Sequence, residues 1–358
     1  SFVLFLRSNI AGLGFYRTDS LLSALDKFLM IVIVGTIFLV PAWKATLTIL
    51  DFALIQTISL SVTLVIALSV LVPYVQFRGF TMKKAFAWMI LRQMAPFALV
   101  TFLMTLYTRL DVVMIEKLLP DGKFEAGIYA AGFRLLDAAN NVGFLMAGLL
   151  LPMFSRMLKT RENVNPTILT AVRIILPVAV AATGLLVFFG EEVMLLLHRP
   201  NATPYWGSVT GVVFCSFIAI SLMYVFGTLL TAAGKLKQMN IVFFIGVLAN
   251  VLLNWYLIGE YAALGAAWAS LITQSGITLA LIFLCARLLD AGLTSGWWLK
   301  IIAFGVISWG LIWGASQMIH EWVLAFIIGG VAVLIWSLVS RMIDISELRK
   351  ILPDRSGR

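Results

Sequence analysis

The sequence has few charged residues, two histidines and two cysteines. Charged side chains make up 12% of its 358 residues, against about 25% in soluble domains, and 61% of the residues are apolar. The mean hydropathy is +1.02. A water-soluble fold is excluded, and the composition predicts an all-α membrane protein.

The scarcity of cysteine and histidine also limits the chemistry. Cys215 and Cys285 lie within apolar runs, where cysteine behaves as a small hydrophobic residue, and neither has the spacing of a metal or redox motif. His198 and His320 fall on separate predicted loops, and the acidic residues lack metal-ligand spacing. We therefore predict no cofactor, no metal site and no catalytic residue, so that the protein is not an enzyme.

The net charge of +9 is spread over short segments between apolar stretches, which predicts no nucleic-acid partner.

A bilayer core of about 30 Å is crossed by about 20 apolar helical residues. Ten stretches qualify, and we predict a polytopic bundle of about ten transmembrane helices at residues 21–43, 53–75, 93–118, 127–154, 167–190, 207–233, 239–258, 262–286, 298–318 and 322–340.

The positions of lysine and arginine predict the orientation, because cytoplasmic loops retain positive charge. Of the 26 basic residues, one set of alternate loops holds only Lys44, Lys117, Lys123 and Arg199, and two more lie inside predicted helices. The remaining twenty fall in the other set of loops and in the terminal segments. Both termini are therefore predicted to be cytoplasmic.

The chain begins without methionine, and its apolar residues Ser1 to Leu6 run directly into the polar stretch from Arg7 to Asn9. This segment has neither the basic region nor the cleavage site of a signal peptide. We expect it to be the end of a helix whose beginning precedes the sequence, so that the chain is a fragment.

The two basic residues outside both sets of loops, Arg109 and Arg134, lie well inside the third and fourth predicted helices, together with Asp111 and Asp137. An ionisable group in hydrocarbon costs several kcal/mol unless it is paired or faces water, so such residues mark a functional site by default. At 1.5 Å per residue, Arg109 and Arg134 would lie at similar depths, roughly 10 to 14 Å from the outer helix ends.

The spacing of Arg134, Asp137 and Asn141 predicts one polar helix face, with Asn140 at its edge. In one interpretation this face borders a hydrated cavity, whose cations bind an anionic group and whose amides and carboxylates bind hydroxyls. In the other, the four charges neutralise one another in a closed network that fixes helix packing. The sequence leaves both open.

Three side-chain amides lie in the seventh and eighth predicted helices. Asn250 and Asn254 share a helix face, and Gln274 follows in the next helix. Such amides either form hydrogen bonds between helices or line a cavity. We include Asn250 and Asn254 among the candidate substrate-binding residues.

Three parts of the sequence resemble the polysaccharide and oligosaccharide exporters of the MOP superfamily, the Wzx-like flippases. The first part is Leu6 to Gly14 with Thr18 to Lys27. The others are Asp111 with residues 127–134 and 151–156, and then residues 233–235, 250–254 and 264–270. Their order along the chain makes the resemblance more specific than any one of them.

The resemblance implies a MATE-like fold of two helical lobes around a central cavity. It also implies flipping of a polyprenyl-pyrophosphate-linked oligosaccharide across a bacterial inner membrane, for surface polysaccharides such as O-antigen. Membrane lipids and a coupling ion, H⁺ or Na⁺, would be further partners. Since such flippases usually have twelve to fourteen helices, we expect the first four to be missing.

We accordingly expect residues 1–85 to be the rest of an N-terminal lobe, with a cytoplasmic loop and two transmembrane helices. Residues 86–290 would form a C-terminal lobe of six helices, and residues 291–358 would hold two extra helices and a cytoplasmic tail.

Two other functions remain open. One is a cation-coupled multidrug exporter in which Asp111 or Asp137 exchanges protons, and the other is a membrane enzyme of polysaccharide assembly.

Overall fold

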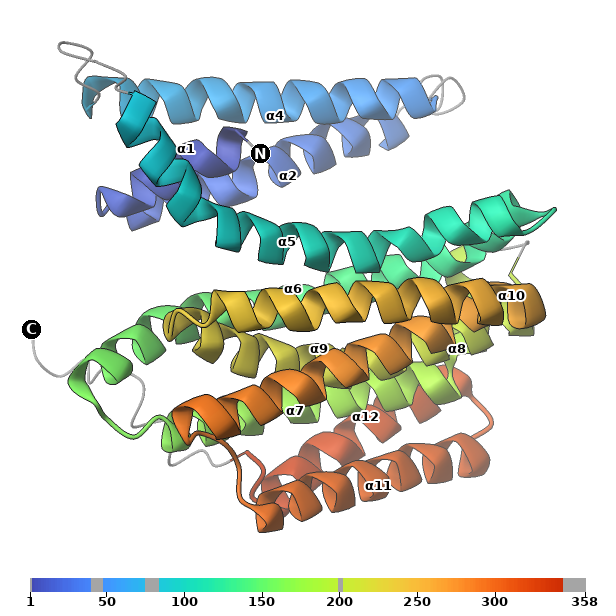
Figure 1. Ribbon diagram of the computed structural model, residues 1–358. Helices are drawn as coiled ribbons and strands as arrows, with labels where there is room; N and C mark the ends of the chain where they lie inside the picture. The colour runs from blue at the N-terminus through green and yellow to red at the C-terminus, as the bar shows by residue number, and fades with distance from the viewer. Residues whose placement is uncertain (1, 40–47, 75–83, 199–201, 344–358) are drawn as a thin grey trace, which may run out of the picture. The chain divides into compact units, whose positions relative to one another are not determined.

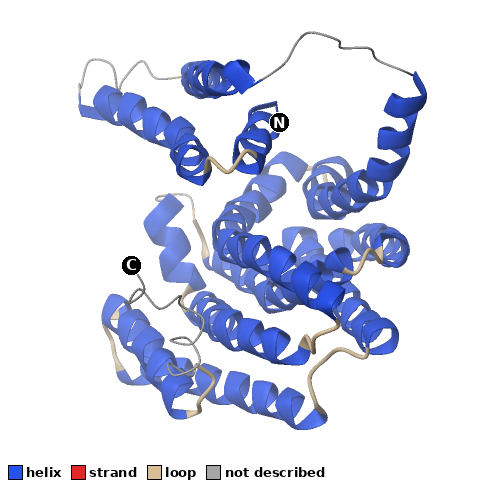
Figure 2. Cartoon of the chain, turned by 90° about the vertical axis from the view of Figure 1, so that its left-hand side faces the viewer, coloured by secondary structure: helices blue, strands red, loops and turns tan. Residues whose placement is uncertain are grey.

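The structure, a computed structural model, describes residues 2–39, 48–74, 84–198 and 202–343. The described residues are helical, with connecting turns and no strand (Figure 2). Nine of these helices are long and apolar enough to cross a membrane. The prediction of an all-α, polytopic membrane protein is confirmed. Most of the predicted cytoplasmic tail lies outside the described residues.

The chain divides into two compact units, Ser1–Ala87 and Trp88–Arg358. The first unit contains α1 (Phe2–Gly12), α2 (Tyr16–Leu39), α4 (Ile49–Leu71) and the short 3₁₀ helix η1 (Val72–Tyr74). Leu6, Ile10, Leu22 and Ala67 form its buried apolar cluster. At the start of α4, Thr48 and Asp51 form a capping box. Their side chains accept hydrogen bonds from backbone N–H groups that have no partner within the helix.

The second unit is built around α9 (Pro204–Ala232), which contacts α6 (Gly122–Thr160), α7 (Asn165–Phe188), α8 (Gly190–His198) and α10 (Leu236–Leu289) (Figure 1). Most of the apolar span of α9 is buried. The pair α11 (Ser295–Met318) and α12 (Trp322–Val339) packs against α7. Because lipid is as apolar as these side chains, close packing and hydrogen bonds hold the helices together.

Helix α10 has 54 residues, which would make a straight helix of roughly 80 Å, far longer than a bilayer core. It turns back at Ala262, where the backbone is not helical, and Gly246 on one arm lies against Ile277 on the other. The predicted helices 239–258 and 262–286 are these two arms. With the two arms of α10 counted separately, the described residues contain ten helical spans long enough and apolar enough to cross a membrane.

The ends of several helices differ from prediction. α5 (Lys84–Leu118) begins nine residues before the predicted limit at residue 93, and α6 extends beyond 127–154 at both ends. A search for apolar runs finds only the apolar part of a helix. Polar residues such as Lys84 and Lys159 continue the same backbone hydrogen bonding beyond that part. The short α8 was not predicted at all.

The turn of α10 is held by two side chains from neighbouring helices. Glu125 of α6 accepts hydrogen bonds from the Ala263 N–H at 3.1 Å and from the Tyr205 hydroxyl at 3.0 Å. The Tyr205 oxygen in turn accepts the Leu264 N–H at 3.3 Å. These bonds satisfy the first free N–H groups of the returning arm.

Ala262 has φ 51° and ψ −131°, a conformation in which a Cβ atom is strained by about 1–3 kcal/mol. Ala262→Gly should remove this strain, partly offset by the greater freedom of glycine in the unfolded chain. We expect a higher thermal midpoint in detergent. The matched control, Ala280→Gly, lies in regular helix and should lower the midpoint, since glycine there costs about 1 kcal/mol. Equal losses for both variants would contradict the assignment of strain to Ala262.

Candidate functional site

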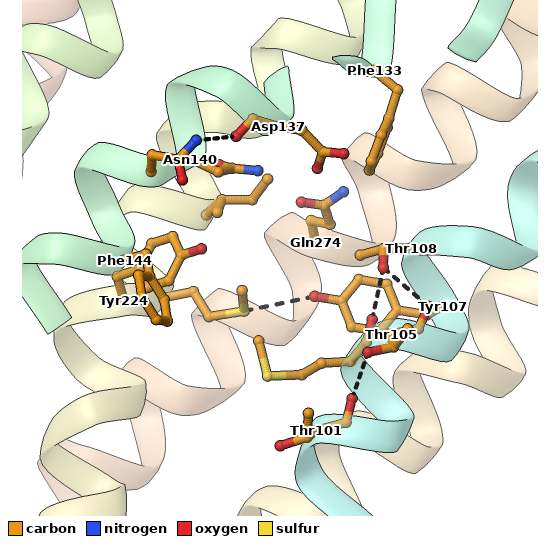
Figure 3. A pocket seen from close by; sticks show the side chains of 14 residues that line it. Thr101, Thr105, Tyr107, Thr108, Phe133, Asp137, Asn140, Phe144, Tyr224 and Gln274 are labelled. Carbon is orange, nitrogen blue, oxygen red and sulfur yellow. Dashed lines mark hydrogen bonds between the residues drawn. The ribbon is translucent and has the colours of Figure 1, made fainter. Parts of the chain in front are cut away.

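A pocket of about 440 Å³ lies within the second unit, between α5, α6, α9 and the returning arm of α10. The predicted residues Asp137, Asn140 and Asn141 line it from α6. Figure 3 shows Asp137 and Asn140 on this wall. Its other walls are lined by Thr101, Met104, Thr105, Tyr107, Thr108, Phe133, Phe144, Ile220, Met223, Tyr224 and Gln274. Polar and aromatic groups therefore meet in a cavity inside membrane-spanning helices.

The wall formed by α5 carries three threonines spaced by four and three residues. Thr101, Thr105 and Thr108 each donate a hydrogen bond to a backbone carbonyl one turn earlier, at 3.2, 2.8 and 3.0 Å. Their protons are thus engaged by the helix, and their oxygens can still accept. With Asp137, the pocket offers several acceptors to a ligand that is rich in hydroxyl donors.

Arg109 and Asp137 form an ion pair at the pocket, with 3.0 Å between Nη2 and Oδ2. The side chains are 59% and 41% exposed, and the guanidinium also lies 5.2 Å from the centroid of the Phe133 ring. A pair this exposed contributes at most about 1 kcal/mol to stability. It can therefore open to bind a charged ligand at little cost.

Asp111 lies in a different environment, fully buried between α5, α6 and α10. Its Oδ2 accepts the Tyr129 hydroxyl proton at 2.6 Å. Its Oδ1 accepts from Asn250 Nδ2 at 3.0 Å and from Asn254 Nδ2 at 2.7 Å. No basic residue of the described chain pairs with it, and Asn254 Oδ1 is buried without a hydrogen-bond partner. The structure thus brings Asp111, Asn250 and Asn254 together in a closed polar cluster.

Arg134 lines a second pocket, of about 610 Å³, with Lys123, His198 and Trp206. Its side chain is exposed, and no carboxylate of the described residues lies within ion-pair distance of it. The eight predicted residues therefore separate into three groups. Arg109 is paired with Asp137 beside Asn140 and Asn141, Asp111 joins the two amides of α10, and Arg134 lies apart from both.

Several residues of these sites were not predicted, including the three threonines, Tyr129 and Tyr224. The spacing of Thr101, Thr105 and Thr108 places them on one helix face and could have indicated a polar wall. The tyrosines carry no comparable pattern, because their role depends on helices distant in sequence. Among the described residues, no group of three or more His, Cys, Asp or Glu side chains could hold a metal ion.

Comparison with known families and structures supports the resemblance found in the sequence. Residues 12–158 match the family model described as "Polysaccharide biosynthesis protein", so the predicted resemblance to polysaccharide exporters is confirmed over these residues. They contain Asp111, Asp137 and Arg134, whereas Asn250 and Asn254 lie beyond them. No curated protein sequence matches the chain.

Among solved structures, the chain is similar to one entitled "Lipid II flippase MurJ, inward closed conformation". The TM-score is 0.65 at 14% sequence identity, and the alignment covers 97% of this chain and 72% of that one. The chain therefore shares the polytopic helical fold of that structure, and its long apolar helices make it a multi-pass membrane protein.

Proposed function

We propose that this chain flips a polyprenyl-pyrophosphate-linked oligosaccharide from the cytoplasmic to the outer leaflet of the bacterial inner membrane, for surface polysaccharide synthesis. The observation that carries the proposal is the pocket lined by Asp137, the α5 threonines and the α6 amides. It combines acceptors for sugar hydroxyls with a cation, Arg109, beside them. The family match over residues 12–158 points to the same substrate class.

The mechanism we propose is alternating access, in which rocking of two helical lobes exposes the polar headgroup to one side and then to the other. The polyprenyl tail would remain in lipid, and the Arg109–Asp137 pair would open to hold the pyrophosphate or sugar. No covalent step is required, so we propose a transporter and not an enzyme. Both termini would lie in the cytoplasm, as the distribution of lysine and arginine predicts.

We further propose that the Asp111 cluster binds the coupling ion, H⁺ or Na⁺. A buried carboxyl group without a basic partner must either take a proton or attract a cation, since an isolated charge is costly in a low dielectric. Asn254 Oδ1 has no hydrogen-bond partner and would add a neutral oxygen ligand for Na⁺. The candidate site therefore has two parts, a substrate pocket and an ion-binding cluster.

The two arginines test the proposal. Arg109→Ala and Arg134→Ala should each lower surface polysaccharide at least about tenfold in cells that depend on this protein, because Arg109 is the cation paired with Asp137 at the substrate pocket and Arg134 is the cation of the second pocket. The protein level, measured by immunoblot, should not change. Arg156→Ala, an exposed change at the other end of α6, is the matched control and should have no effect. Wild-type polymer in both arginine variants would refute the proposed roles.

A second candidate function is a cation-coupled multidrug exporter. The observation that favours it is the grouping of Phe133, Phe144 and Tyr224 around the Asp137 carboxylate, which is suited to a flat organic cation. Proteoliposomes distinguish the two. Movement of a cationic dye driven by a pH gradient would support the exporter, whereas flipping of a lipid-linked saccharide without dye movement would support the flippase. Turnover of a sugar-lipid donor by the purified protein would instead indicate an enzyme.

A further inference from the structure

Gln274 joins the two parts of the candidate site. It lies on the returning arm of α10, is 1% exposed, and contributes to the pocket wall between Asp137 and Tyr107 (Figure 3). Its position four residues after Ser270 places both side chains on one face of the helix. Its side chain is thus close to the substrate pocket on one side and to the buried cluster on the other.

A line of polar contacts runs from Gln274 through Ser270 to Asp111. Gln274 Nε2 donates to Ser270 Oγ at 2.7 Å. The Ser270 hydroxyl interacts in turn with the carboxyl group of Asp111 and with Tyr129. Ser270 Oγ accepts a hydrogen bond from the amide of Gln274, so its own hydroxyl proton is free, and the carboxylate beside it can only accept. This order fixes the direction of the chain, from the pocket towards the carboxylate.

The pocket end of this chain is incomplete. Gln274 Oε1 is buried and has no hydrogen-bond partner in the described structure. Buried polar atoms are almost always satisfied, so a lone acceptor at a pocket wall is available to a donor on a ligand. A sugar hydroxyl is such a donor. Its bond to Oε1 would extend the chain by one member, and each bond in such a chain polarises the next.

We propose that Gln274 is a positioning residue through which the substrate pocket and the ion site at Asp111 sense each other. This inference rests on the proposed function. The ionised carboxylate is the strongest acceptor at the end of the chain, so it strengthens the bond that Gln274 makes to the substrate. A proton or Na⁺ on Asp111 weakens that acceptor. Substrate and ion therefore oppose each other's binding, which suits an exchange of one for the other.

The test is the effect of the ion on substrate affinity. The full chain in nanodiscs would bind a synthetic polyprenyl-pyrophosphate-linked disaccharide, with Kd measured with and without Na⁺ at constant ionic strength, and at pH 6 and pH 8. We expect the coupling ion to raise the Kd of the wild-type protein by a factor of about 5 or more, the usual lower range of coupling between sites. Gln274→Leu should reduce this factor below about 2.

Two further variants make the result specific. Ser270→Ala breaks the same chain at its other member and should also remove the ion effect. Gln317→Leu makes the same chemical change at an exposed glutamine of α11 and should retain it. Loss of affinity in Gln274→Leu with an unchanged ion factor would mean that Gln274 only contacts the substrate, and would overturn the inference.

Asp111→Asn separates this inference from the proposed ion site. If Asp111→Asn abolishes the ion effect but Gln274→Leu and Ser270→Ala do not, the ion site stands and the connection through Gln274 is refuted. If Asp111→Asn leaves the ion effect intact, the proposed ion site itself is wrong. An ion that lowers the Kd would contradict the predicted sign.

Discussion

Gly143→Ala is expected to abolish transport while leaving a folded protein. Gly143 lies on α6, and a Cβ atom there would overlap the ring of Tyr224, which lines the substrate pocket. The ring must move, and the pocket wall moves with it. Overpacking costs about 1–3 kcal/mol of stability, whereas a misplaced wall affects every substrate contact. We expect flipping of a lipid-linked saccharide in proteoliposomes to fall by about 100-fold or more.

The same helix supplies a control. Gly148→Ala adds a Cβ atom into open space and should transport normally. The double variant Gly143→Ala with Tyr224→Ala tests the cause, because neighbouring residues couple non-additively. If the clash is responsible, Gly143→Ala should have little further effect once the ring is removed. A full additional loss in the Tyr224→Ala background would show that Gly143 acts in another way.

Asp111→Leu is expected to destabilise the protein strongly. It leaves the Tyr129 hydroxyl and Asn250 Nδ2 without their acceptor in a dry interior, and it leaves Asn254 Nδ2 only its bond to Asn250 Oδ1. Each unsatisfied buried donor costs about 1–3 kcal/mol, so the total should be about 3 kcal/mol or more. The thermal midpoint in detergent should fall markedly. Asp111→Asn keeps the shape and one acceptor oxygen, and should cost less while abolishing the ion dependence of transport.

Asp137→Leu is the matched control for stability. Its carboxylate is 41% exposed and its ion pair is accessible to solvent, so the thermal midpoint should change little. Transport should nevertheless be lost, because Asp137 lines the pocket. An equal thermal loss for Asp111→Leu and Asp137→Leu would contradict the distinction drawn between a sealed cluster and an open pocket.

The sequence predicted the membrane-spanning helices well, because an apolar run of about 20 residues has few alternatives in lipid. It also predicted two separate helices divided at residues 259–261, directly before the turn at Ala262. It did not predict α8, which is too short to be recognised from an apolar run, or the polar extensions of α5 and α6. These depend on local hydrogen bonding and on neighbouring helices.

The candidate site was predictable in part. Helical spacing identified the α6 face of Asp137 and Asn141 and the paired amides of α10. It placed Arg134 on the same face as Asp137, yet the pocket of Arg134 is lined by α6 residues 123–134 and that of Asp137 by α6 residues 133–144. The two pockets therefore follow each other along the helix axis, and helical spacing does not show where one ends and the next begins. Asp111 forms hydrogen bonds with Asn250 and Asn254, which follow it by more than 130 residues in the sequence. No local sequence pattern predicts contacts over that separation.

The reactivity of a cysteine in the pocket tests most directly whether this polar face borders water. Asn141→Cys would be made with Cys215→Ser and Cys285→Ser and treated with a membrane-impermeant thiosulfonate from both sides of the membrane. Leu252→Cys, at an exposed apolar position of α10, is the control, since thiolates form and react only in water. We predict labelling at position 141 at least about tenfold faster than at position 252, slowed by a lipid-linked saccharide. Equal, slow labelling at both positions would contradict a hydrated substrate pocket.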